Sequence, residues 1–298
     1  MIIPEFLRGT TSWARNGYFY YDDKPRLFVD TPKNGWRVFY RALELAKTGD
    51  FSKIETLYDW ISPTFYHVLS NACMGLIGDA GNRSDLIRIR SILDQAPEEF
   101  LGGAARAAAN TGYLSFVPTM LNAWRRSISR DTHAQIGLAI ADIMAPFGSQ
   151  IAEFSSTYNS NPDLLQKLVD RKQLPPAERQ APAQTEFELL VVRRYEELRG
   201  LYPGNVSLWQ GDPYDVQKLI REMMSRAQHG VQEMQGVFIA QRHKLEATIG
   251  WNLSSAFKDR VPHPLGAMAL LEDILENVEL DRFEIGKRYF FGHPLHDG

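Results

Sequence analysis

The feature that most constrains this chain is a repeated pattern of paired apolar segments across residues 65–154. Each unit holds an apolar segment with helical spacing, a turn that contains glycine, and a second apolar segment. The turn glycines are Gly81, Gly112 and Gly148, which lie 31 and 36 residues apart. Periods of roughly 20 to 50 residues with two helices per unit are typical of helical solenoids, because one unit cannot bury its apolar face alone. The sequence therefore predicts a mainly all-α fold, an α-solenoid of antiparallel helix pairs.

Two segments outside this array also have helical patterns. Residues 36–47 and residues 264–278 carry apolar side chains at spacings of three and four, which is one face of a helix. Residues 36–61 form a further two-helix unit at the amino-terminal edge of the array. Within the array, Ser84 is expected to cap the helix that follows it.

Composition divides the chain into four parts. Residues 17–29 hold two aromatic or β-branched runs around a turn-forming cluster, which predicts a small β-hairpin. Residues 171–185 contain three prolines and no aromatic residue, which is typical of a linker or disordered loop. The predicted organisation is an amino-terminal extension, helical repeats, this linker and a carboxyl-terminal helical block, at residues 1–35, 36–170, 171–185 and 186–298.

Charge and composition exclude several classes of partner. The net charge of −3 offers no basic excess for neutralising phosphates, which argues against nucleic-acid binding. No window approaches 18 apolar residues, so we expect no membrane span, and the amino terminus lacks a signal-peptide pattern. The single cysteine, Cys73, permits no intrachain disulfide and suits a reducing compartment. We therefore expect a cytoplasmic protein.

Motifs of catalysis and metal binding are missing from the sequence. The sequence contains no nucleophile-elbow motif, no phosphate-binding loop and no dinucleotide-binding glycine pattern. Only His293 and His296, next to Asp297, approach a metal-ligand cluster, and they stand in a proline-bearing tail. We expect no catalytic residues, no metal and no cofactor.

The most one-sided charge on the chain lies near its carboxyl end. Glu272, Asp273, Glu276 and Glu279 are acidic, and three of them fall at spacings of four and three on one helix face. Such a run is either a solvated helix face or a docking surface for a basic partner, because complementary charge steers association. Paired catalytic carboxylates are a third interpretation, for which the sequence gives no geometry.

Aromatic residues supply further candidate contacts. Tyr20 and Tyr21 lie in the predicted hairpin, and Trp209 lies in an irregular, exposed-looking loop. Tyr and Trp are enriched at interaction hot spots, although at least half of the rings in a strand pack inward. We include these three residues with the acidic run as predicted partner-binding positions.

The paired segments, with Asp79 and either Asn110 or Thr111 near the turns, resemble HEAT-like repeats. The chain as a whole is similar to immunity proteins of bacterial polymorphic and type VI secretion toxins, in size, acidic balance and the segment at residues 286–295. This resemblance implies a stoichiometric inhibitor that binds a cognate toxin with a basic surface, such as a nuclease. The alternatives are a general HEAT-like protein scaffold and a helical-repeat enzyme. A deep polar pocket with convergent titratable groups would favour the enzyme.

Overall fold

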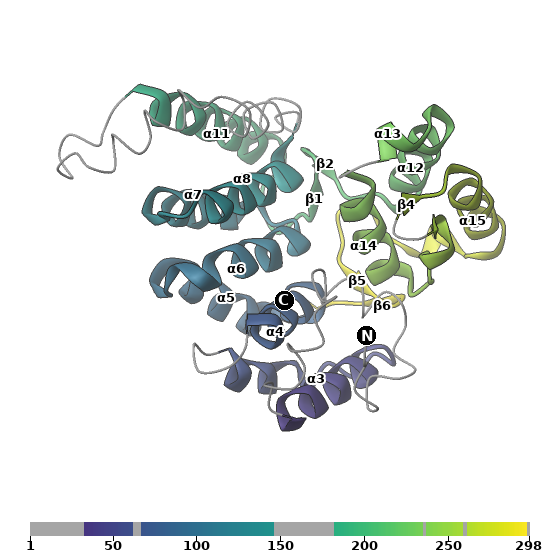
Figure 1. The fold of residues 1–298 in the computed structure, drawn as a ribbon, viewed down its shortest axis with the longest axis horizontal. Coiled ribbons are helices and arrows are strands. Elements are labelled where there is room, and N and C mark those ends of the chain that lie inside the picture. The colour runs from purple at the N-terminus through teal and green to yellow at the C-terminus, as the bar shows by residue number, and fades with distance from the viewer. Residues whose placement is uncertain (1–32, 62–66, 146–181, 235–236, 259–260, 297–298) are drawn as a thin grey trace.

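The computed structural model describes residues 33–61, 67–145, 182–234, 237–258 and 261–296. This part of the chain is mainly helical, with small antiparallel strand pairs, which confirms the predicted helical class (Figure 1). Within it, every helix is too short or too polar to cross a membrane. The predicted amino-terminal hairpin, Gly148 and residues 171–181 of the predicted linker lie outside the described residues. Residues 182–185, predicted to belong to that linker, instead form the start of a helix.

The first group of helices stacks from bottom to top along the left of Figure 1. Its elements are α3 (Lys33–Ala46), η2 (Ile54–Trp60), α4 (His67–Ala80), α5 (Arg83–Gln95), α6 (Glu98–Thr111), η3 (Leu114–Phe116), α7 (Val117–Arg126), α8 (Arg130–Met144) and α11 (Pro182–Leu201). Helices α4, α6 and α8 pack in sequence as one row, while α5 packs on α6 and α7 packs on α8. We call α3 through α8 the array.

Close packing within the row depends on small residues. The alanines of α6 are buried at Ala104, Ala105, Ala107 and Ala108. A Cβ built on Gly78 of α4 would lie 2.4 Å from the backbone oxygen of Ala107. The backbones of α4 and α6 therefore touch at a point where no larger residue fits.

The turns of the array follow local rules of helix ends. Asn82, rather than the predicted Ser84, caps α5: its side chain accepts from the backbone N–H of Asp85, whose carboxylate accepts from the backbone N–H of Asn82 in return. This reciprocal pair places the helix start two residues earlier than expected. Gly112 ends α6 with a φ of 71°, which is the left-handed conformation that favours glycine.

The second group of elements forms a block on the right of Figure 1. It comprises β1 (Leu208–Trp209), β2 (Asp212–Pro213), α12 (Val216–His229), α13 (Val231–Met234), α14 (Val237–Ile249), η4 (Ser254–Ala256), β3 (Phe257–Lys258), β4 (Val261–Pro262), α15 (Pro264–Asn277), η5 (Leu280–Arg282), β5 (Tyr289–Phe290) and β6 (His293–Pro294). The strand pairs are β1–β2, β3–β4 and β5–β6, each antiparallel. We call these elements the second block.

Two hydrophobic cores follow this division. The first core spans the array and α11, to which Phe187, Val191 and Leu198 contribute. The second core begins at Trp209 and joins α12, α14 and α15. Phe290 of β5 is fully buried in the first core, so the end of the chain returns to the array.

Candidate functional site

Helix α15 places the predicted acidic run on the surface of the second block. The His263 side chain caps the helix by accepting from the backbone N–H of Gly266 at 2.9 Å. Ala267, Leu271 and Ile274 are buried in the second core. The opposite face is therefore turned to solvent, because residues three and four apart share a face.

The predicted acidic positions are all exposed: Glu272, Asp273, Glu276 and Glu279. The expectation that Glu279 shares one helix face with Glu272 and Glu276 is wrong, because α15 ends at Asn277 and Glu279 lies in the turn before η5. Among the described residues, Glu272, Glu276 and Glu279 form no ion pair, and Asp273 accepts a hydrogen bond from the amide of Asn277 at 2.6 Å. Residues 264–281 contain five carboxylates and no Lys or Arg. The net charge of the whole chain is −3, which is smaller in magnitude than the charge of these five carboxylates. The rest of the chain therefore carries a slightly positive net charge. The face is thus a concentrated negative surface that has no ion-pair partner among the residues that the structure describes.

The aromatic predictions have different outcomes. Tyr20 and Tyr21 lie outside the described residues. The expectation that Trp209 is exposed is wrong: its side chain is 9% exposed and packs in the second core. The reason is that residues 208–213 form a tight strand pair, with positive φ at Gln210 and Gly211, which folds the indole inward.

A second candidate site, which the sequence did not indicate, lies where the second block meets the array. We call this contact the seam. Its central element is α14, whose polar side chains are buried on all sides: Gln241, Arg242, Lys244, Glu246 and Thr248 are each no more than 7% exposed. Burial of charged groups is unfavourable unless partners compensate it. Within α14, the buried Arg242 Nε lies 3.1 Å from a carboxylate oxygen of Glu246.

Arg288 supplies hydrogen-bond donors to the buried carbonyl oxygens at the carboxyl-terminal end of α4. Its guanidinium donates to the backbone oxygens of Gly78 at 2.7 Å and Gly81 at 3.1 Å, and it lies 5.5 Å from the ring centre of Tyr113. The last carbonyls of a helix have no partner within the helix and carry a partial negative charge. Arg288 therefore supplies both donors and an opposite charge to this buried helix end.

Lys244 supplies a donor and a positive charge to the carboxyl-terminal end of α6 in the same way. Its ammonium donates to the backbone oxygen of Asn110 and lies 4.8 Å from the ring centre of Tyr214. Burial, followed by the positive charge of Arg288, lowers the pKa of Lys244 to about 8, against the opposing effect of Asp79 and Asp142. Removing the ammonium from water costs more than the surrounding acceptors and carboxylates return.

The ends of α6 and α8 receive further donors from the start of the second block. The Ser207 hydroxyl donates to the Thr111 oxygen at 2.8 Å. The backbone N–H groups of Gln210 and Gly211 donate to the oxygens of Asp142 and Ile143 at 2.8 and 2.9 Å. All three helices of the row thus end against the seam, and every one has donors from outside the array.

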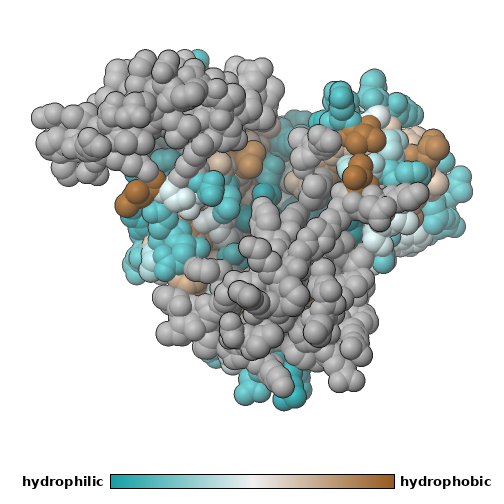
Figure 2. Space-filling model, in the orientation of Figure 1, coloured by the Kyte–Doolittle hydropathy of each residue, from teal (hydrophilic) through white to brown (hydrophobic). Residues whose placement is uncertain are grey.

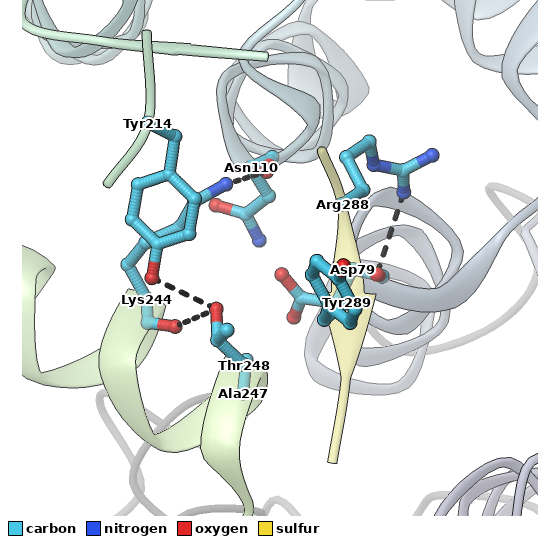
Figure 3. A pocket seen from close by; sticks show the side chains of 8 residues that line it. All are labelled: Asp79, Asn110, Tyr214, Lys244, Ala247, Thr248, Arg288 and Tyr289. Atoms are coloured by element: carbon cyan, nitrogen blue, oxygen red, sulfur yellow. Dashed lines mark hydrogen bonds between the residues drawn. The ribbon is translucent and has the colours of Figure 1, made fainter. Parts of the chain in front are cut away.

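A small polar pocket remains at the centre of the seam (Figure 3). It is lined by Asp79, Asn110, Tyr214, Lys244, Ala247, Thr248, Arg288 and Tyr289. Two of the polar contacts around the pocket involve these lining residues. His243 Nε2 lies 2.9 Å from an oxygen of Asp79, and the Tyr214 hydroxyl lies 2.9 Å from the Thr248 hydroxyl. The cavity volume is about 10 Å³, which holds about one water molecule. In this state the pocket admits water and no larger ligand.

Within the described ranges, no group of three or more His, Cys, Asp and Glu residues has the arrangement to hold a metal ion. Cys73 is fully buried in the first core, and burial raises the pKa of its thiol. A neutral buried thiol is a poor nucleophile and metal ligand. The chemistry available at the two sites is therefore that of carboxylates, one amine, one imidazole and phenols.

No protein-family model matches the chain, and no curated protein or solved structure matches it.

Proposed function

We propose that the protein is a non-catalytic binding protein that neutralises a cognate bacterial toxin by direct contact, as an immunity protein does. The observation that carries this proposal is the exposed acidic surface of α15 and the turn after it, where Glu272, Glu276 and Glu279 form no ion pair in the described part of the chain. The packed helix fixes the backbone positions of Glu272 and Glu276 before a partner arrives. A basic toxin, such as a nuclease, has the complementary charge.

The physical role of this face is to attract and orient the partner. Complementary charge raises association rates and disfavours partners of the wrong sign, and the effect weakens as salt screens it. Buried hydrogen bonds of the seam join the second block to the array, and α15 packs on α12 within that block.

We further propose that the array and the residues beside it form a HEAT-like α-solenoid in a cytoplasmic protein. The row of α4, α6 and α8, with α5 and α7 packed on it, supports this arrangement. Polymorphic toxins and toxins of type VI secretion are the class of partner that the overall resemblance implies. A general scaffold protein would have the same helical frame. The gene neighbourhood would distinguish an immunity protein from such a scaffold, because an immunity gene lies directly beside a toxin gene.

The test is protection of growth. The protein is co-expressed with the product of the adjacent gene, and survival is measured for Glu272→Lys/Glu276→Lys against the native chain. We expect the double variant to lose protection. The matched control is Glu55→Lys/Glu233→Lys, which reverses two exposed carboxylates elsewhere and should protect fully. Full protection by the α15 variant, with expression unchanged, would remove this face from the proposed function.

A catalytic function at the seam is a second candidate, and one observation favours it. Asp79, His243, Lys244 and Tyr214 bring four titratable groups together around one pocket. Clusters of this kind are typical of active sites, and they also occur where buried structure is held together. Because the cavity holds about one water, a substrate would enter only if the seam opened. Loss of growth protection in a folded Lys244→Met variant that still binds the toxin would favour catalysis.

A further inference from the structure

The outward face of α15 carries exposed apolar residues as well as carboxylates. Leu265 in its first turn is 78% exposed, and Val261, two residues before the capping His263, is 53% exposed. Ala269, one turn after Leu265, is also exposed. Figure 2 shows hydrophobic patches among hydrophilic surface on the second block. A leucine exposed to this extent on a stable helix gives the folded monomer almost no burial energy.

These residues divide the face into two halves along the helix axis. Leu265, Ala269, Glu272 and Glu276 follow one another at steps of four, three and four residues, which keeps them on one side of the helix. At 1.5 Å per residue this line is about 16 Å long, or roughly three turns. Its first half is apolar and contains the small Ala269. Its second half is acidic, and Glu279 and Asp281 follow in the chain beyond the end of α15.

Resting on the proposed function, we infer that the partner docks an amphipathic helix along this line, with apolar side chains at one end and Lys or Arg at the other. The apolar end covers Leu265 and Val261. The small side chain of Ala269 lets the partner helix approach closely. The basic end pairs with Glu272, Glu276 and Glu279, whose charges have no cation in the described chain. Both halves are needed, because leucine burial supplies affinity and the carboxylates fix direction.

A second copy of the chain fits this face poorly. If two α15 helices packed in parallel across a twofold axis, the carboxylates of one copy would face those of the other and repel them. If they packed antiparallel, the carboxylates of each copy would be buried against Leu265 of the other without a cation. The exposed arginines of α7 are already engaged: Arg125 pairs with Glu188 at 2.9 Å, and Arg126 donates to the Leu93 oxygen at 2.7 Å. An anionic membrane surface is disfavoured by the same five carboxylates.

The test uses two synthetic fluorescent peptides of about four turns. In the first, the leucines occupy the first two turns of one face and the lysines occupy the last two. The second has the same composition, with leucines and lysines interleaved along that face. Binding to the full chain is measured by fluorescence anisotropy. We expect the divided peptide to bind at least about tenfold more tightly than the interleaved one, which corresponds to about 1.4 kcal/mol.

Two variants localise the binding. Leu265→Glu and Glu272→Lys/Glu276→Lys should each weaken the divided peptide about tenfold or more. Ile87→Glu, on α5, is the matched control, since Ile87 is 62% exposed and lies on the array. All four substituted positions are exposed, so folding is checked by circular dichroism and expected to be unchanged. Equal binding of the two peptides, or an Ile87→Glu effect as large as that of Leu265→Glu, would overturn the helix-docking inference.

The same variants separate this inference from the proposed function. If Leu265→Glu protects against the toxin as well as the native chain does, while the charge reversal does not, the binding function stands and the docked helix is wrong. If the divided peptide binds as expected but the charge reversal still protects fully, the helix site stands and the immunity function through this face is wrong.

Discussion

The Arg288 guanidinium donates to the backbone oxygen of Gly78 at 2.7 Å, although the two residues are 210 positions apart in the sequence. Gly78 lies near the end of α4, at the contact with α6, and Arg288 lies just before β5. This bond joins the last strand pair of the chain to the first helix of the row. It makes the end of the chain part of the frame that carries α15.

Replacing Arg288 should weaken the whole fold. In Arg288→Met, the buried oxygens of Gly78 and Gly81 lose their donors, which costs about 2 to 4 kcal/mol of the free energy of unfolding. Chemical denaturation measures this change. Arg199→Met is the control, because Arg199 is exposed and its distance to Glu196 is 3.8 Å, so its effect should stay within about 0.5 kcal/mol. Equal stability of the two variants would show that the seam is not structural.

The buried ammonium of Lys244 should make stability depend on pH. Its pKa is lowered from 10.5 to about 8 in the folded state, so between these values the unfolded chain binds more protons. The free energy of unfolding therefore rises with pH across this window, by about 2 kcal/mol from pH 7.5 to 9.5. Lys244→Met should remove this rise. The comparison is made by denaturation of both proteins at each pH, and parallel pH curves would contradict the burial of the charge.

The contact between α4 and α6 should tolerate no added methyl group. In Gly78→Ala, the new Cβ would meet the Ala107 oxygen at 2.4 Å, which forces the two helices apart and costs about 1 to 3 kcal/mol or more. Gly200→Ala is the matched control within α11, where nothing lies within 4 Å of the added Cβ. That change should stabilise the protein by about 0.5 to 1 kcal/mol through helix propensity. Thermal unfolding of both variants checks the opposite signs.

Much of the local structure could be predicted from the sequence. The apolar spacings of residues 36–47 and 264–278 correspond to α3 and α15. These features depend on residues a few positions apart, which one sequence displays directly. The cap of α5 was misplaced because Ser84 and Asn82 are both good caps, and only the reciprocal bond with Asp85 selects Asn82.

The seam could not be predicted in this way. Helix α14 has no apolar stripe, because it is surrounded by two cores and by helix ends, so periodicity gave no signal for it. Arg288 and Lys244 resemble ordinary surface cations until the chain is folded. The same limitation explains Trp209, which stands in a polar loop sequence and becomes buried through tertiary packing. In the sequence, residues 241–244 are a polar run, and such runs are ordinarily exposed.

The central claim is that the acidic face of α15 receives the partner. The most direct test is to measure by calorimetry, at low and high salt, how the product of the adjacent gene binds to the purified full chain. The account predicts that Glu272→Lys/Glu276→Lys weakens binding at least about tenfold at low salt and reduces its dependence on salt, because the steering charge is gone. Glu55→Lys/Glu233→Lys should bind like the native chain. Native affinity and native salt dependence in the α15 variant would contradict the claim that this face receives the partner.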